Sequence, residues 1–144
     1  MGWTRTTQPY GVGLGQWSDG NYNGADNTED DLAKITSQNG FGYRPDDHGS
    51  STGSATAISI TSDPPVLLDE GIIEKNTDLD FFAFALTSGG ELQVSIHPDS
   101  LAPNLDILAR IHDASGTVLH TSNPSDALNA EFNLTLPAGN YYLS

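Results

Sequence analysis

The sequence contains no cysteine and very few basic residues. Among its 144 residues, five lysines and arginines stand against 19 aspartates and glutamates, which gives a formal net charge of -14 at pH 7. Without thiols the chain forms no disulfide and no thiolate zinc site. A surface of this charge repels nucleic acid and anionic lipid, which bind to basic patches. We therefore expect no nucleic-acid partner, whereas the many carboxylates suit hard cations such as Ca²⁺.

Long apolar runs are also absent from the sequence. No stretch approaches the ~18 consecutive apolar residues of a membrane-spanning helix, so we expect no membrane insertion. The opening residues, MGWTRTTQPYG, do not have the pattern of a signal peptide. The last residues, NYYLS, are typical of a strand that is still in progress. We therefore expect both ends of the sequence to lie within a longer protein.

The first third of the chain is rich in glycine and has one helix signal. Residues 1–25 show no apolar periodicity and predict irregular backbone. Asn27 or Thr28 can cap a helix whose first turn is acidic, which the helix dipole favours. Gly40 is a natural stop. This pattern predicts a helix over about residues 28–39, too short to be stable alone in water.

From residue 55 onward, apolar and polar residues alternate. Six or seven short runs, among them DFFAFAL, ELQVSIHP and EFNLTLP, have this period of two, and turn sequences such as TSGG, DASG and PAGN separate them. The pattern predicts a mainly β fold, an antiparallel β-sandwich whose core is formed by the alternating apolar residues. A polar glycine–serine stretch over residues 43–56 predicts a linker, which divides the chain into residues 1–43 and 44–144.

Residues 19–30, DGNYNGADNTED, contain two competing patterns. Oxygen-bearing side chains alternate from Asp19 and Gly24 occupies the sixth position, as in an EF-hand calcium loop. Against this, Asp26 stands where an apolar residue is expected, and the preceding glycines exclude an entering helix. A turn that leads into a capped helix is the favoured alternative, since a motif without its structural context is weak.

Four aspartates near the predicted linker form a second candidate calcium site. Asp46 and Asp47 belong to DDHG, and Asp78 and Asp80 belong to DLD. These carboxylates can supply oxygen ligands to a hard cation if the linker meets the start of the sandwich. The alternative is that Asp78 and Asp80 simply mark a turn and a strand edge, which are common places for Asp. His48, without a second histidine nearby, is interpreted as a turn residue and not a ligand.

Several short motifs follow one another in a specific order: Met1-Gly2, Gln16-Trp17-Ser18, Asn27 with Asp30-Asp31-Leu32, and Asp46-Asp47-His48-Gly49. Their order resembles the C-terminal end of the catalytic domain of secreted bacterial metzincin-type (reprolysin-like) zinc metallopeptidases. Residues 71–144 resemble a pre-peptidase C-terminal (PPC-like) domain. The resemblance implies that residues 1–43 are the tail of the peptidase domain, with its last helix, and that residues 44–144 are a PPC-like, jelly-roll-type sandwich truncated at its C-terminus. Met1 would occupy the Met-turn, a structural position and not a metal ligand.

The same resemblance limits what this chain does by itself. The family's chemistry needs H-E-x-x-H-x-x-G-x-x-H, in which histidines bind zinc and the glutamate activates water. His48, His97, His112 and His120 are scattered, and none has a partner four residues on. The resemblance thus implies that the zinc ligands lie upstream, in the parent enzyme, and that peptide or protein substrates bind to the missing catalytic domain. We expect no catalytic residue here, an inactive chain, and secretion from a bacterium.

A different class of function stays open at this point. The chain can also be a calcium-dependent, non-catalytic module that binds carbohydrate or a cell-surface partner. Exposed aromatic rings would then make the contacts, and the candidates are Trp3, Tyr10, Trp17, Tyr22 and Tyr43.

Overall fold

The computed structural model describes residues 23, 28–38, 40–58, 69–75, 77–101, 103 and 105–144. Met1 and most of the candidate EF-hand-type loop that begins at Asp19 lie outside these residues. The chain divides into two compact units, Met1–Arg44 and Pro45–Ser144. Each unit is described by itself, and the assignment of the first unit to the tail of a peptidase domain stays a prediction.

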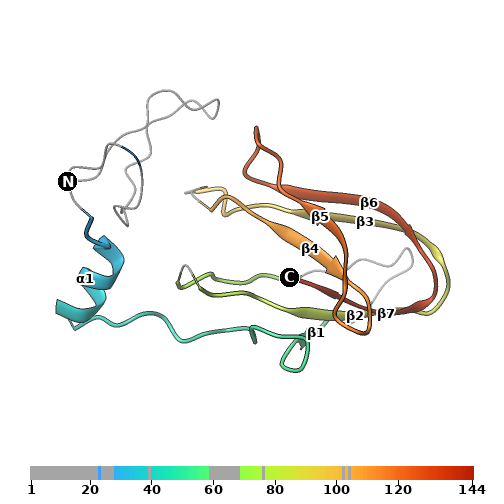
Figure 1. Ribbon diagram of the computed structural model, residues 1–144, viewed down its shortest axis with the longest axis horizontal. Coiled ribbons are helices and arrows are strands. Elements are labelled where there is room, and N and C mark those ends of the chain that lie inside the picture. The colour runs from blue at the N-terminus through green and yellow to red at the C-terminus, as the bar shows by residue number, and fades with distance from the viewer. Residues whose placement is uncertain are drawn as a thin grey trace. The chain divides into compact units, whose positions relative to one another are not determined.

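The described part of the first unit contains one helix, α1, Asp31–Gln38 (Figure 1). It begins later than residue 28 because Asp30, and not Thr28, caps it: the Ala33 N–H donates to Asp30 Oδ1 at 3.0 Å. After the helix, Gly40 has a φ of 72°, a left-handed conformation that glycine adopts without strain. Within the described residues, no helix has the length and apolarity to span a membrane.

The second unit contains two β-sheets (Figure 1). The larger has five strands in the order β1-β2-β7-β4-β5, and the smaller pairs β3 with β6. The strands are β1 Thr56–Ala57, β2 Phe82–Leu86, β3 Gly90–Ile96, β4 Ala109–His112, β5 Val118–Ser122, β6 Ala130–Leu136 and β7 Gly139–Leu143. The predicted mainly β fold with one short helix is confirmed.

Strand pairing is antiparallel except at one edge of the larger sheet. The pairs β2–β7, β4–β7, β4–β5 and β3–β6 are antiparallel, whereas β1 runs parallel to β2 with Thr56 opposite Phe82. This parallel pair departs from the wholly antiparallel arrangement that alternation predicted. Its physical reason is the long connection over residues 58–81, because parallel neighbours need a crossover of about a dozen residues or more.

The core lies between the two sheets and is built by alternation along the strands. Its buried members are Phe84, Leu92, Ala109, Ile111, Ala130, Phe132, Leu136 and Tyr141. They come from β2, β4 and β7 of one sheet and from β3 and β6 of the other. Leu105 lies before β4, which begins at Ala109, and is 41% exposed.

The turn between β4 and β5 is held by one carboxylate. Asp113 Oδ1 accepts hydrogen bonds from the Ser115 hydroxyl at 2.6 Å and from the Thr117 N–H at 3.0 Å. These bonds favour the charged form and lower the pKa of Asp113. Gly116, in the same turn, has a φ of 84°. The DASG sequence thus folds into the tight connection that its composition predicted.

Candidate cation site

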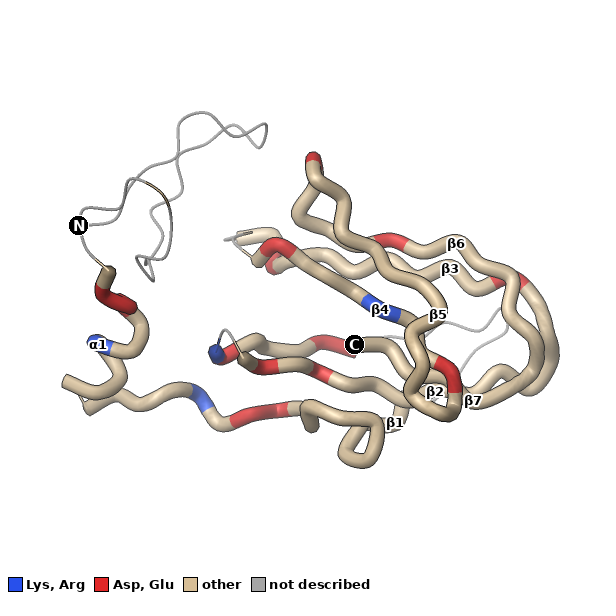
Figure 2. The backbone as a smooth tube through the Cα atoms, in the orientation of Figure 1, with Lys and Arg blue, Asp and Glu red and all other residues tan. Residues whose placement is uncertain are grey.

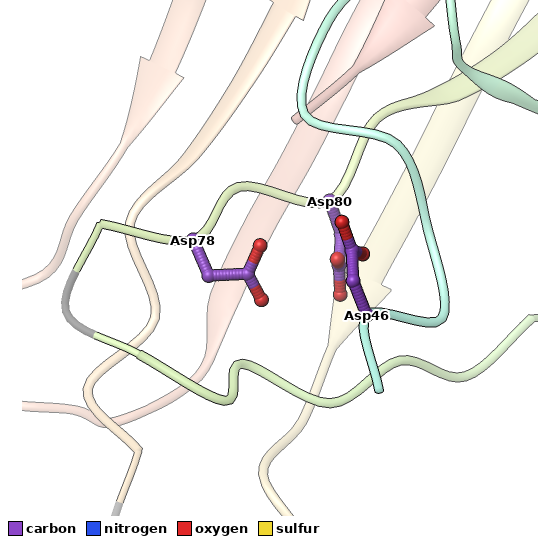
Figure 3. Close-up of side chains that lie close together, drawn as sticks. All are labelled: Asp46, Asp78 and Asp80. Carbon is purple, nitrogen blue, oxygen red and sulfur yellow. The ribbon is translucent and has the colours of Figure 1, made fainter. Parts of the chain in front are cut away.

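Three of the four predicted aspartates come together where the chain enters the sandwich (Figure 3). Asp46, Asp78 and Asp80 each have a carboxylate oxygen, and these oxygens all lie within 4.8 Å of one another. Asp46 lies on the segment before β1, and Asp78 and Asp80 lie on the segment before β2. Because β1 and β2 are parallel neighbours, both segments enter the sheet from the same end. Acidic residues recur along these two segments (Figure 2).

Local hydrogen bonds set the backbone around two of these carboxylates. Asp46 Oδ1 accepts from the His48 N–H at 3.2 Å. Asp78 Oδ2 accepts from the Glu74 N–H at 3.3 Å, and the Asp78 N–H donates to the Lys75 carbonyl at 3.0 Å, which closes a short turn. Asp is favoured at such positions because its short side chain bonds to the nearby backbone. These local bonds shape each segment, and the parallel pairing of β1 with β2 brings the two segments together.

Asp47, the fourth predicted residue, lies outside the group of three. Its Oδ1 accepts from the Ile72 N–H at 3.4 Å, and its Oδ2 lies 4.0 Å from His48 Nε2. Asp47 thus contacts the segment that precedes Asp78 and Asp80 in the chain. Its charge still contributes to the electrostatics of the group.

Asp80 has a buried oxygen without a partner. The residue is half-buried as a whole, but its carboxylate end is buried, and Oδ1 has less than 1 Å² of exposed surface and no hydrogen-bond partner among the described residues. The same holds for Oε1 of Glu74 nearby. Buried polar atoms nearly always have a partner, so a proton, a water molecule or a cation could satisfy the Asp80 oxygen.

The charges of these neighbouring carboxylates are unfavourable to one another, as two raised pKa values show. Burial, followed by repulsion from Asp78 and Asp47, raises the pKa of Asp80 to about 6, although His48 acts in the opposite sense. Burial and a hydrogen bond with the Asp78 side chain also raise the pKa of Glu74. The carboxylates therefore resist full ionisation until a cation compensates their charge.

His48 contacts three different segments of the chain next to the site. Its Nδ1 lies 2.8 Å from Thr56 Oγ1 and its Nε2 lies 2.7 Å from the Glu70 carbonyl oxygen. Its ring packs on Phe82 with 4.6 Å between the ring centroids. Burial lowers the pKa of His48, but the Glu70 carbonyl and the charges of the surrounding aspartates outweigh it, so that the pKa is raised. The prediction of a simple turn residue missed these long-range contacts.

Gly71 is a further residue that sequence reasoning missed. A Cβ at this position would overlap with Asp80 Oδ2 and would lie 3.2 Å from His48 Cδ2. A larger residue at position 71 would displace the Asp80 carboxylate from this position. Nothing local in the sequence separates Gly71 from the chain's many other glycines, because the contact joins residues distant in sequence.

The donor set fits a hard cation such as Ca²⁺ better than it fits zinc. The group is all-carboxylate, and hard oxygen ligands suit Ca²⁺, whereas zinc prefers nitrogen and sulfur. Carboxylate oxygens that lie within 4.8 Å of one another are close enough to bind one such ion together. Water and backbone carbonyls would complete its six to eight ligands.

Comparison with known proteins gives little beyond this. No known protein family matches the chain, and no curated protein matches it. Among solved structures, the pre-peptidase C-terminal domain of collagenase from Bacillus anthracis is similar, with 18% sequence identity and a TM-score of 0.37. The match covers 44% of this chain and 59% of that domain, so the chain spans less than two thirds of its length. The fold of this chain is therefore defined by its own strands and core.

Proposed function

We propose that the unit Pro45–Ser144 is a non-catalytic, calcium-binding accessory sandwich of a secreted bacterial zinc metallopeptidase. The observation that carries the calcium part is the buried, unpartnered Oδ1 of Asp80 beside Asp46 and Asp78. A cation there would satisfy the orphaned oxygen and offset the mutual repulsion that raises the pKa of Asp80. The bound ion would join the segment before β1 to the segment before β2.

The parent enzyme is inferred from the order of the sequence motifs. Met1-Gly2, Gln16-Trp17-Ser18 and the DDHG junction follow one another as in metzincin-type peptidases. Hydrolysis of peptide bonds by that parent would depend on zinc. The zinc-binding motif of the family does not occur in this sequence. The role of the accessory unit would be structural or in attachment. Secretion accords with a calcium site, because extracellular calcium modules work at ~10⁻⁴–10⁻³ M.

The carbohydrate-binding alternative has less support. Four of its five candidate aromatic residues, Trp3, Tyr10, Trp17 and Tyr22, lie outside the described residues. The fifth, Tyr43, belongs to the first unit and not to the sandwich. Calcium binding alone does not distinguish the two functions, so titration with a panel of polysaccharides separates them.

Calcium binding is tested by isothermal titration calorimetry of the whole chain. We expect about one Ca²⁺ per chain with a dissociation constant of ~10⁻⁵–10⁻³ M, and weaker binding of Mg²⁺. Asp80→Asn should weaken the binding of Ca²⁺ at least ~10-fold because it removes a ligand charge. Asp126→Asn, which changes an exposed carboxylate in the turn between β5 and β6, is the matched control and should bind as the wild type does.

Two results would overturn the proposal. A wild-type chain that takes up no Ca²⁺ at millimolar concentration, or an Asp80→Asn variant that binds as well as the wild type, contradicts the calcium site. Stoichiometric zinc with chelator-sensitive cleavage of casein contradicts the accessory role, because this chain is expected to be inactive.

A further inference from the structure

His48 is tied to three separate parts of the second unit. One ring nitrogen meets Thr56 of β1, the other meets the Glu70 carbonyl, and the ring face packs on Phe82 of β2. A carbonyl oxygen only accepts hydrogen bonds, so Nε2 carries a proton and donates a hydrogen bond to the Glu70 carbonyl oxygen. In the neutral ring, Nδ1 then accepts from the Thr56 hydroxyl. With both nitrogens engaged, His48 has no lone pair directed at the aspartates, and its role there is indirect.

The segment that His48 holds lies against the key carboxylate. Glu70 is followed directly by Gly71, whose backbone meets both Asp80 Oδ2 and the His48 ring. The next residue, Ile72, donates its N–H to Asp47 Oδ1 at 3.4 Å. His48 and Asp47, adjacent in the chain, thus fasten residues 70–72 from both sides. Gly71 of this segment lies close to Asp80 Oδ2, and the other oxygen of the same carboxylate, Oδ1, has less than 1 Å² of exposed surface.

We propose that His48 is the positioning residue of the cation site: it holds residues 70–72 over Asp80, and so keeps that carboxylate dry and directed toward Asp46 and Asp78. This inference rests on the proposed calcium function. A ligand fixed in advance loses little conformational entropy on binding, and one shielded from water is compensated more strongly by a cation. Partners of metal ligands in other proteins contribute about 10–100-fold to metal affinity in this way.

The test compares two amides that replace different nitrogens of the ring. The side-chain nitrogen of His48→Gln can occupy the place of Nε2 and donate to the Glu70 carbonyl. The shorter His48→Asn reaches only the place of Nδ1. We expect His48→Asn to weaken Ca²⁺ binding ~10-fold or more, and His48→Gln to stay within ~3-fold of the wild type. His120→Ala, an exposed histidine of β5, is the control and should leave the affinity unchanged.

A second readout separates positioning from plain stability. Terbium occupies calcium sites, and its luminescence lifetimes in H₂O and D₂O count the water molecules bound to it. If His48 keeps the site dry, terbium in His48→Asn should carry about one more water than in the wild type. Equal affinity and equal hydration in the two amide variants would overturn the inference while the calcium site stands. A wild-type chain that binds neither ion would overturn the proposed function itself.

Discussion

At the scale of single residues, Asp80 carries a charge that works against stability. Burial and neighbouring carboxylates raise its pKa to about 6, so ionisation at neutral pH costs free energy in the folded state. Asp113 is the opposite case, because its hydrogen bonds lower its pKa and its charge stabilises the fold. The charge of Asp80 therefore does not contribute to folding at neutral pH, whereas that of Asp113 does.

This contrast predicts a specific pH dependence of stability in the absence of calcium. The folded pKa of Asp80, about 6, lies above the ordinary value of 3.8, so the folded state binds a proton more tightly between these values. The contribution of Asp80 is therefore fully present below about pH 3.8 and is lost as the pH rises through about 6. Asp80→Asn should remove this slope and raise the free energy of unfolding at pH 7.5 by about 1 kcal/mol, after allowance for solvent screening.

Urea unfolding of both proteins in excess chelator, at steps between pH 4 and pH 8, measures this effect. The difference between wild type and Asp80→Asn isolates Asp80 from the other carboxylates, including Glu74, whose pKa is also raised. A difference that does not change with pH would show that the Asp80 carboxylate is not the strained group described here.

At the scale of elements, the inner strand β4 contributes buried side chains to the core, whereas its neighbour β5, at the edge of the sheet, contributes none. Ile111 of β4 is 0% exposed, whereas Val118 of β5 is 46% exposed. Ile111→Ala should lower the free energy of unfolding by about 2–5 kcal/mol through lost burial and the cavity left behind. Val118→Ala removes apolar atoms at an exposed site of the neighbouring strand and should change it by less than about 0.5 kcal/mol. Chemical denaturation measures the free energy of unfolding of both variants. Similar losses in the two would contradict the assignment of Ile111 to the core.

The pairing of elements also decides the site. The parallel pair β1–β2 brings the linker residue Asp46 beside Asp78 and Asp80. The backbone extends this pairing beyond the strands, since the Phe81 N–H donates to the Gly49 carbonyl at 3.1 Å. The site is therefore positioned by backbone pairing at one edge of the sheet.

At the scale of the whole molecule, the net charge of -14 makes any cation stabilising to some degree. Specific binding must therefore be separated from screening. At a Ca²⁺ concentration of about 100 times the dissociation constant, binding to the folded state adds ~2.7 kcal/mol to its stability. For a domain of this size that corresponds to an increase of about 10 °C in the melting temperature.

Thermal unfolding with calcium, and with sodium chloride of equal ionic strength, checks this expectation. Calcium should raise the melting temperature of the wild type well beyond the sodium chloride value, and a chelator should reverse the increase. In Asp80→Asn the excess effect of calcium over sodium chloride should fall by about half or more, because Ca²⁺ binds at least ~10-fold more weakly. Equal effects of the two salts on the wild type would contradict a specific site.

Much of the fold was predictable because its signals are local. Alternating apolar residues indicated the strands of the sandwich, and Phe84, Leu92 and Phe132 lie buried as the period of two requires. The helix was also predicted, but its start was misplaced, since Thr28 and Asp30 are both good caps and only the structure shows that Asp30 accepts the bond. The parallel direction of β1 was missed, because no local pattern records how a long connection returns.

What the sequence by itself determined is the class of chemistry: carboxylates without thiols or a zinc motif, on short alternating strands. It also pointed to Asp46, Asp78 and Asp80 through their pairing in DDHG and DLD. Only the tertiary structure decided that these three converge while Asp47 contacts Ile72, and that His48 and Gly71 enclose Asp80. The physical reason is that composition and periodicity are properties of neighbouring residues, whereas convergence and burial depend on which distant segments the sheet places together.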